Sequence, residues 1–231
     1  MDETCRVAHC DAINLNFIES NGDESGVIEG YLVQVFVPAN KIEDVDRDNY
    51  CWRVIMSELL PPILEKVQAL KYKVFTNGDW DMNIIGMRSK ERKAGKFDDR
   101  IFLIYKCQGQ WRQHMWACTT DPGTYYLKTA SKDWHEKGTA ITAPGQYPAS
   151  HSIGTHKGYQ ALVQTGKMKC FRDKNMDDVL DMDPESLEEG RFALNIHRSS
   201  ATKISKNNYK WSAGCCVFVD PAGFEEFMRL C

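Results

Sequence analysis

The stretch NIHRSSATKISKNNYKWSAGCCVFVD, residues 195–220, decides how the rest of the chain is interpreted. It contains two short apolar runs, one ending in His197 and one following Cys215, joined by a polar and basic connection. Short apolar runs bounded by turn-forming polar residues are typical of β-strands. The stretch therefore predicts two strands, with a histidine on the first and a cysteine at the entrance to the second.

The residues around the cysteine suit nucleophilic chemistry. Gly214 places little bulk before Cys215, so the backbone can turn tightly there and expose the sulfur. Backbone N–H groups at such a turn can point at a developing oxyanion. A histidine on the adjacent strand can accept the thiol proton. We therefore predict a thiolate–imidazole pair of Cys215 and His197, with the pKa of the thiol below its usual value of about 8.5.

This pattern resembles the catalytic domain of the L,D-transpeptidases (the YkuD type). That family carries a histidine on one strand and Ser/Thr-His-Gly-Cys at the start of another. The matching residues here are Ile196-His197 and Ser212-Ala213-Gly214-Cys215. Upstream, TDPGTYYL at 120–127 is similar to the family's Thr-Pro-x-Gly-x-Phe segment. The resemblance covers roughly residues 100–231.

Two positions depart from the family pattern. Ala213 stands where the family has a second histidine, and Val217 stands where it has Asn or Arg. The first change removes a polar group near the sulfur, and the second removes a substrate contact or loop anchor. Both changes bear on the substrate more than on the cysteine–histidine pair.

The resemblance implies a role for each residue of the motif. Cys215 would be the nucleophile, His197 its general base, and the main-chain carbonyl of Arg198 would orient the imidazole. Backbone N–H groups near Gly214 and Cys215 would form the oxyanion hole. The implied substrate is a peptidoglycan stem peptide, whose acyl group passes to an amine or to water. No cofactor and no metal are implied.

Four further residues are predicted to bind the substrate: Trp211, Ser212, His156 and Tyr147. Trp211 and Ser212 directly precede the cysteine turn, and His156 lies in the glycine-flanked GTHKG loop. Tyr147, in PGQY, would flank the groove. The alternatives are a solvated loop histidine for His156 and a turn aromatic covering the core for Tyr147.

The expected fold is α+β and predominantly β. It is an L,D-transpeptidase-like β-sandwich with a C-terminal helix from Pro221, which Asp220 would cap. Residues 1–95 are assigned to an α/β region of unknown role and residues 96–231 to the catalytic domain. The charged stretch SKERKAGKFDDR, residues 89–100, is either the boundary or a loop inside one domain.

Several local elements are also predicted. We expect a strand over 31–38 and a helix from Asp48 to about Leu60 that resumes over 63–70. Asn77-Gly78 indicates a hairpin. The sequence TYYLKTA, residues 124–130, is predicted to be a strand.

Composition limits the possible partners. The 231 residues carry a formal net charge of −3, which argues against non-specific binding to nucleic acid or anionic membranes. The sequence contains no run of 18 apolar residues, so no membrane-spanning helix is predicted. Nine cysteines without a CxxC pair argue against a disulfide framework and against a structural zinc site.

The polar, acidic N-terminus lacks the features of a secretion signal, so synthesis in the cytosol is expected. A phage-encoded protein released by lysis, or carried in a virion, fits this pattern. Two alternatives to the peptidoglycan enzyme remain: a cysteine peptidase or acyltransferase with another substrate, and a non-catalytic binding or virion structural protein. The sequence does not set the oligomeric state.

Overall fold

The structure, a computed structural model, describes residues 13–19, 60–129 and 136–231. The predicted strand over 31–38 and nearly all of the predicted helix from Asp48 lie outside these residues. The described part of the chain is predominantly β, with few helices, as the sequence predicts. None of its helices has the length and apolarity needed to cross a bilayer.

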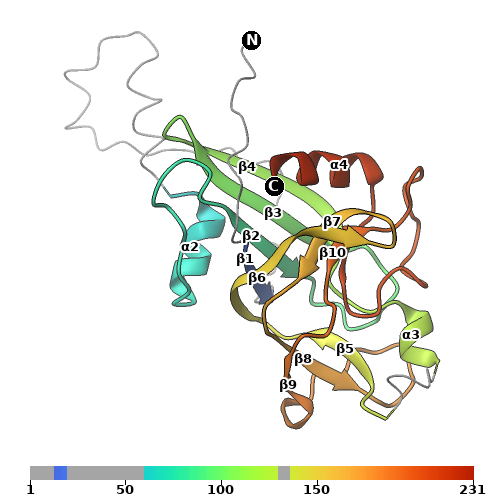
Figure 1. The fold of residues 1–231 in the computed structure, drawn as a ribbon. Helices are drawn as coiled ribbons and strands as arrows, with labels where there is room; N and C mark the ends of the chain where they lie inside the picture. The colour runs from blue at the N-terminus through green and yellow to red at the C-terminus, as the bar shows by residue number, and fades with distance from the viewer. Residues whose placement is uncertain (1–12, 20–59, 130–135) are drawn as a thin grey trace, which may run out of the picture.

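Eight strands form one mixed sheet that curls until its two edges meet (Figure 1). Their order is β1-β2-β3-β4-β11-β10-β7-β6, and β6 also pairs with β1. The strands are β1 (Ile13–Glu19), β2 (Asn83–Arg88), β3 (Asp99–Cys107), β4 (Gln110–Thr119), β6 (Gly145–His156), β7 (Tyr159–Gln164), β10 (Ile196–Arg198) and β11 (Cys216–Phe218).

A second, three-stranded sheet lies at one end of the first (Figure 1). It contains β5 (Thr139–Thr142), β8 (Met168–Asp173) and β9 (Glu188–Gly190), and a 3₁₀ turn, η2 (Pro184–Ser186), precedes β9. The architecture is therefore one closed sheet with a small companion sheet. This strand order differs from the expected sandwich, in which two sheets would face each other.

Alternation along β3 shows how the core is divided. Ile101 and Leu103 pack in the main apolar cluster, whereas Phe102 and Ile104 pack in a second cluster beneath α2 (Pro62–Ala69). Successive side chains of a strand point to opposite faces, so a strand covered on both faces reads as a continuous apolar run. The sequence IFLIY is such a run.

The C-terminal helix α4 (Pro221–Leu230) confirms the prediction for this segment. The side chain of Asp220 accepts a hydrogen bond from the backbone N–H of Ala222 at 3.0 Å, which caps the helix. Phe224, Phe227 and Leu230 lie on one buried face. This face packs across β7, β10 and β11, so it supports the strands that carry the candidate site.

Two local predictions were wrong. Asn77-Gly78 lies in an irregular segment before β2, because Asp79 is used elsewhere: its carboxylate accepts hydrogen bonds from the N–H groups of Gln108 and Gly109 in the β3–β4 turn. Residues 124–130 do not form a strand, since Thr124–Lys128 is the short helix α3.

The stretch 89–98 connects two paired strands. β2 and β3 are antiparallel, with Gly86 opposite Ile101, and β1 extends the same sheet on the other side of β2. A boundary at residue 95 would therefore divide one closed sheet. The alternative interpretation of this stretch, a loop inside one domain, is the one that the strand pairing supports.

Candidate active site

Strands β10 and β11 run side by side and parallel, with Ile196 opposite Cys216. Both of these side chains belong to the main core. Because side chains alternate along a strand, the neighbouring residues His197 and Cys215 are directed to the other face. The fold thus brings the predicted base and nucleophile to adjacent strands.

The turn before Cys215 is held from within. The hydroxyl of Ser212 accepts a hydrogen bond from Gly214 N at 3.0 Å and donates one to Cys215 O at 2.8 Å. Gly214 has φ +121°, and a Cβ built there would lie 2.6 Å from the carbonyl oxygen of Ala140. Only glycine fits this position without moving the backbone.

Two predicted roles change as a result. Ser212 is fully buried, so its side chain shapes the turn and is not presented to a substrate. The N–H of Gly214, predicted as an oxyanion donor, is already used by Ser212. Gly214 contributes the backbone conformation of the turn in place of a hydrogen bond.

The thiol of Cys215 is 8% exposed and donates a hydrogen bond to the carbonyl oxygen of Ala193 at 3.3 Å. Burial raises its pKa to about 11, although the backbone N–H of Asn195 opposes this effect. Across the described ranges, no hydrogen bond joins this sulfur to His197. In this conformation Cys215 is a neutral thiol, and the predicted thiolate–imidazole pair is not formed.

His197 has a fixed orientation. Its Nδ1 lies 2.8 Å from the carbonyl oxygen of Arg198, which is the predicted contact. A carbonyl oxygen can only accept, so Nδ1 carries the proton and Nε2 carries the lone pair. Burial lowers the pKa of His197 to about 3, and the neighbouring His156 adds to this effect. The imidazole is therefore neutral, with an unprotonated Nε2 that accepts a proton only weakly in this conformation.

Tyr159 was missed by the sequence analysis. Its hydroxyl lies 3.3 Å from both His197 Nδ1 and the Arg198 carbonyl oxygen. The Arg198 guanidinium covers its ring, with Cζ 4.2 Å from the ring centre. The signal in the sequence was its place directly after Lys157-Gly158, a two-residue hairpin turn in which both residues have positive φ.

His156 lies at the other side of that turn and stacks on His197, with the ring centres 4.2 Å apart. Asn195 fixes its tautomer. The Asn195 side-chain oxygen accepts from the N–H of Gln164 at 2.9 Å, so the amide nitrogen donates to His156 Nδ1 at 3.1 Å. The proton of neutral His156 is therefore on Nε2, which is buried and has no hydrogen-bond partner among the described residues.

The two predicted aromatic residues differ in position. Tyr147 is buried in the main core, and its hydroxyl donates to the carbonyl oxygen of Ala143 at 2.7 Å. Burial raises its pKa to about 12. It covers the core, the alternative weighed for it, and does not flank a groove. Trp211 is 39% exposed and remains available to a ligand.

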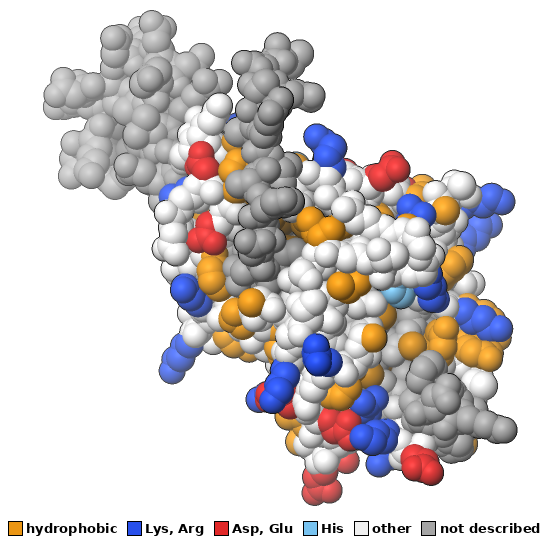
Figure 2. All heavy atoms as spheres, viewed as in Figure 1, with side chains coloured by type: hydrophobic (Ala, Val, Ile, Leu, Met, Phe, Trp, Pro, Cys, Tyr) orange, Lys and Arg blue, Asp and Glu red, His pale blue; other side chains and the backbone are white. Residues whose placement is uncertain are grey.

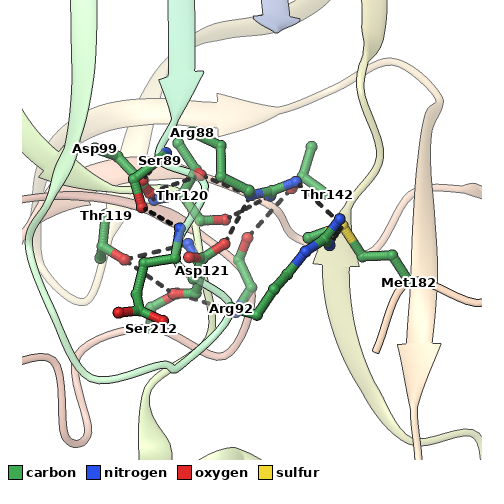
Figure 3. Close-up of polar contacts among 12 residues, drawn as sticks. Arg88, Ser89, Arg92, Asp99, Thr119, Thr120, Asp121, Thr142, Met182 and Ser212 are labelled. Carbon is green, nitrogen blue, oxygen red and sulfur yellow. Dashed lines mark hydrogen bonds and ion pairs between the residues drawn. The ribbon is translucent and has the colours of Figure 1, made fainter. Parts of the chain in front are cut away.

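A buried polar network lies beside the loop between β10 and β11 and holds it in place (Figure 3). The carboxylate of Asp121 forms an ion pair with Arg88 at 2.8 Å, and Asp99 accepts a hydrogen bond from Thr120 N at 2.6 Å. The main-chain oxygen of Asp121 accepts from the side chain of Asn208 at 2.9 Å. These contacts tie the ends of β2, β3 and β4 to the loop that leads to Cys215.

The loop that leads to Cys215 also explains why α3 is helical. The N–H groups of Gly123, Thr124 and Tyr125 donate to main-chain oxygens of residues 208–212. A Cβ on Gly123 would lie 2.4 Å from the Tyr209 carbonyl oxygen, so this close approach requires glycine. These tertiary hydrogen bonds determine the backbone here in place of the β-propensity of the tyrosines.

No group of three or more His, Cys, Asp or Glu side chains in the described part of the chain is arranged to hold a metal ion. Comparison of the chain with protein-family models, with curated proteins and with solved structures gives no match.

Proposed function

We propose that the protein is a cysteine-nucleophile acyltransferase that acts on peptidoglycan stem peptides, on a fold related to that of the L,D-transpeptidases. One observation carries the proposal. His197 is held through Nδ1 by the Arg198 carbonyl oxygen, which leaves an oriented and unprotonated Nε2 on the strand beside Cys215. Such orientation of a base next to a nucleophile is what acyl transfer through a thioester requires.

In the proposed reaction, His197 Nε2 takes the Cys215 proton while the sulfur attacks the carbonyl carbon of the substrate. The carbonyl oxygen becomes an oxyanion, for which the backbone N–H of Cys215 is the remaining donor of the turn. The C–N bond then breaks, and the imidazolium gives its proton to the leaving amine. An amine or water finally attacks the thioester and releases Cys215 as a thiol.

This reaction requires one rearrangement. The sulfur must leave the Ala193 carbonyl oxygen and turn toward His197, while the Ser212–Gly214 turn stays in place. Rotation of a cysteine side chain between staggered positions is a small motion compared with a backbone change. We propose that substrate binding favours the second position.

A non-catalytic binding or virion structural protein is the second candidate. The burial and neutral state of the Cys215 thiol favour it, as does Ala213 in place of a histidine. A cysteine enzyme with a substrate other than peptidoglycan is the third. In each case we propose synthesis in the cytosol, with release by lysis or within a virion.

The experiment compares the full-length protein with Cys215→Ala and with Cys216→Ala as a matched control. Each is incubated with isolated peptidoglycan and soluble stem peptides, and the products are identified by mass spectrometry. New cross-links or trimmed stems that disappear in Cys215→Ala but persist in Cys216→Ala support the proposal. No product from the unmodified protein on either substrate would rule it out.

A further inference from the structure

The two segments that build the candidate site contain no acidic residue. They are residues 137–172, which run from β5 to the residue before Asp173 at the end of β8, and residues 191–219, which contain β10 and β11. The whole chain has 32 Asp and Glu residues, so this is a strong local bias. The bias is cationic, because these segments carry several Lys and Arg residues.

The β6–β7 hairpin places the backbone of one Lys residue, Lys157, next to the site. Lys157 occupies the turn with φ +47°, between His156, whose ring stacks on His197, and Gly158. A two-residue turn of this kind leaves little freedom for the backbone. The Lys157 charge acts on Cys215, His156 and His197, and in each case it lowers the pKa.

Arg198 provides a second cation at the same place. Its guanidinium is held over the Tyr159 ring, with Cζ 4.2 Å from the ring centre, while the Tyr159 hydroxyl contacts His197. The Arg198 charge lowers the pKa of Tyr159, whereas the Lys157 charge lowers those of Cys215, His197 and His156. On the face drawn in Figure 2, Lys or Arg side chains lie beside a histidine at the surface.

We propose that Lys157 and Arg198 bind a carboxylate of the substrate next to the bond that is cleaved, so that the substrate class is an acidic acyl donor. A cationic site without an opposing acid attracts anions and disfavours neutral or cationic ligands. The specificity rests on the proposed function, since it concerns the substrate of the same cysteine.

The test compares alkylation of Cys215 by anionic iodoacetate and by neutral iodoacetamide. Each reagent forms the same S–C bond with loss of iodide, so the rate ratio of the two reports the local charge. Mass spectrometry of the full-length protein gives this ratio for Cys215 and, in the same sample, for half-buried Cys107 as a reference thiol. We expect the ratio to be about tenfold higher at Cys215 and to fall as salt is added.

Lys157→Asn removes the charge and retains a residue that tolerates positive φ. We expect it to remove most of the iodoacetate preference, whereas Lys66→Gln on the exposed face of α2 should not. If Lys157→Asn fails to fold, Arg198→Gln tests the second cation and keeps the main-chain carbonyl. Equal ratios at Cys215 and Cys107, or an unchanged ratio in the folded variant, overturn the proposal.

A second arm separates this inference from the proposed function. Stem peptides with free carboxylates are compared with the same peptides bearing amides, and the readout is kcat/KM. Turnover without preference for the carboxylate form overturns the inference and leaves the enzyme proposal standing. An iodoacetate preference without turnover of either peptide supports the charge inference and contradicts the peptidoglycan function.

Discussion

The imidazole rings of His156 and His197 lie face to face, with their centres 4.2 Å apart and their planes 20° apart. Two imidazolium ions at this distance would repel each other, so a proton on one ring disfavours a proton on the other. Together with burial, this contact keeps His197 neutral over a wide pH range. The stacked pair thus keeps His197 Nε2 unprotonated, and its effect on the pKa of His197 can be measured.

Replacing His156 by Asn removes the stacked ring and opens His197 to water. We expect the pKa of His197 to rise by about one unit or more, because both causes of its depression weaken. The acid limb of the activity profile then moves to higher pH, since a protonated His197 cannot act as a base. NMR titration of the His197 ring checks this without relying on activity. A His114→Asn variant on β4 is the control, and an unchanged His197 titration in His156→Asn would contradict the prediction.

The buried thiol of Cys215 predicts an unusual pH dependence of alkylation. Its pKa is raised to about 11, so the reactive thiolate is scarce at neutral pH. We expect alkylation by iodoacetamide to be slow at neutral pH and to increase until the pH approaches 11. An apparent pKa below 8 would show that the thiol pairs with His197 in solution and that the Ala193 contact is not its resting state.

Replacing Ser212 by Ala removes the hydroxyl that holds the cysteine turn. Gly214 N–H and the Cys215 carbonyl oxygen would both lose their partner in a buried place, so we expect a loss of about 1–3 kcal/mol in the free energy of unfolding. Urea denaturation measures this loss. Ser205→Ala is the control, because Ser205 contributes a backbone hydrogen bond to Val219 O. Equal stability of the two variants would show that the hydroxyl does not hold the turn.

Gly214→Ala tests the backbone of the same turn. The φ of +121° disfavours any side chain, and the added Cβ would lie 2.6 Å from Ala140 O. We expect a destabilisation of roughly 1–3 kcal/mol and loss of the proposed activity, since Cys215 must shift with the turn. The same substitution at Gly158, where a Cβ meets nothing within 4 Å, separates backbone strain from the steric contact. If Gly214→Ala is no worse than Gly158→Ala, the close approach to Ala140 is not important.

Because His151 is buried, we expect the free energy of unfolding to decrease in mild acid. Burial lowers its pKa to about 4, and its Nε2 donates to the Leu194 carbonyl oxygen at 2.7 Å. The unfolded chain therefore binds more protons than the folded one between about pH 6.5 and 4, so stability falls as the pH falls through this window. His151→Asn should reduce this slope by up to about 1.4 kcal/mol per pH unit, measured by urea denaturation at several pH values. An identical slope in the variant would contradict the assignment.

The parts of the site that were predictable are local in sequence. The strand ending at His197, the turn before Cys215 and the helix from Pro221 each depend on neighbouring residues, such as the Asp220 cap or the small Gly214. The contact between His197 and Arg198 is also local. For these features, short patterns contain the physical cause of the structure.

The remaining parts depend on contacts between distant segments. Tyr159 and Asn195 reach the histidines only because β7 pairs with β10, and no local pattern indicates that pairing. The buried Arg88–Asp121 ion pair joins the ends of strands that are far apart in the chain. Tyr147 looked like a groove residue, yet its place is set by the Ala143 carbonyl oxygen and the surrounding core.

Because β1 closes the eight-stranded sheet, a fragment of the protein that lacks it should fold poorly. β1 pairs with β2 on one side and with β6 on the other, so Ile13 lies opposite His151. A fragment that begins at residue 60 would leave β2 and β6 with unpaired N–H and C=O groups along exposed edges, which invite aggregation through added strands. The pairing also joins segments far apart in sequence, which slows folding. We therefore expect β1 to be needed to close the sheet during folding, so that its removal yields insoluble protein even though the candidate site residues all lie downstream.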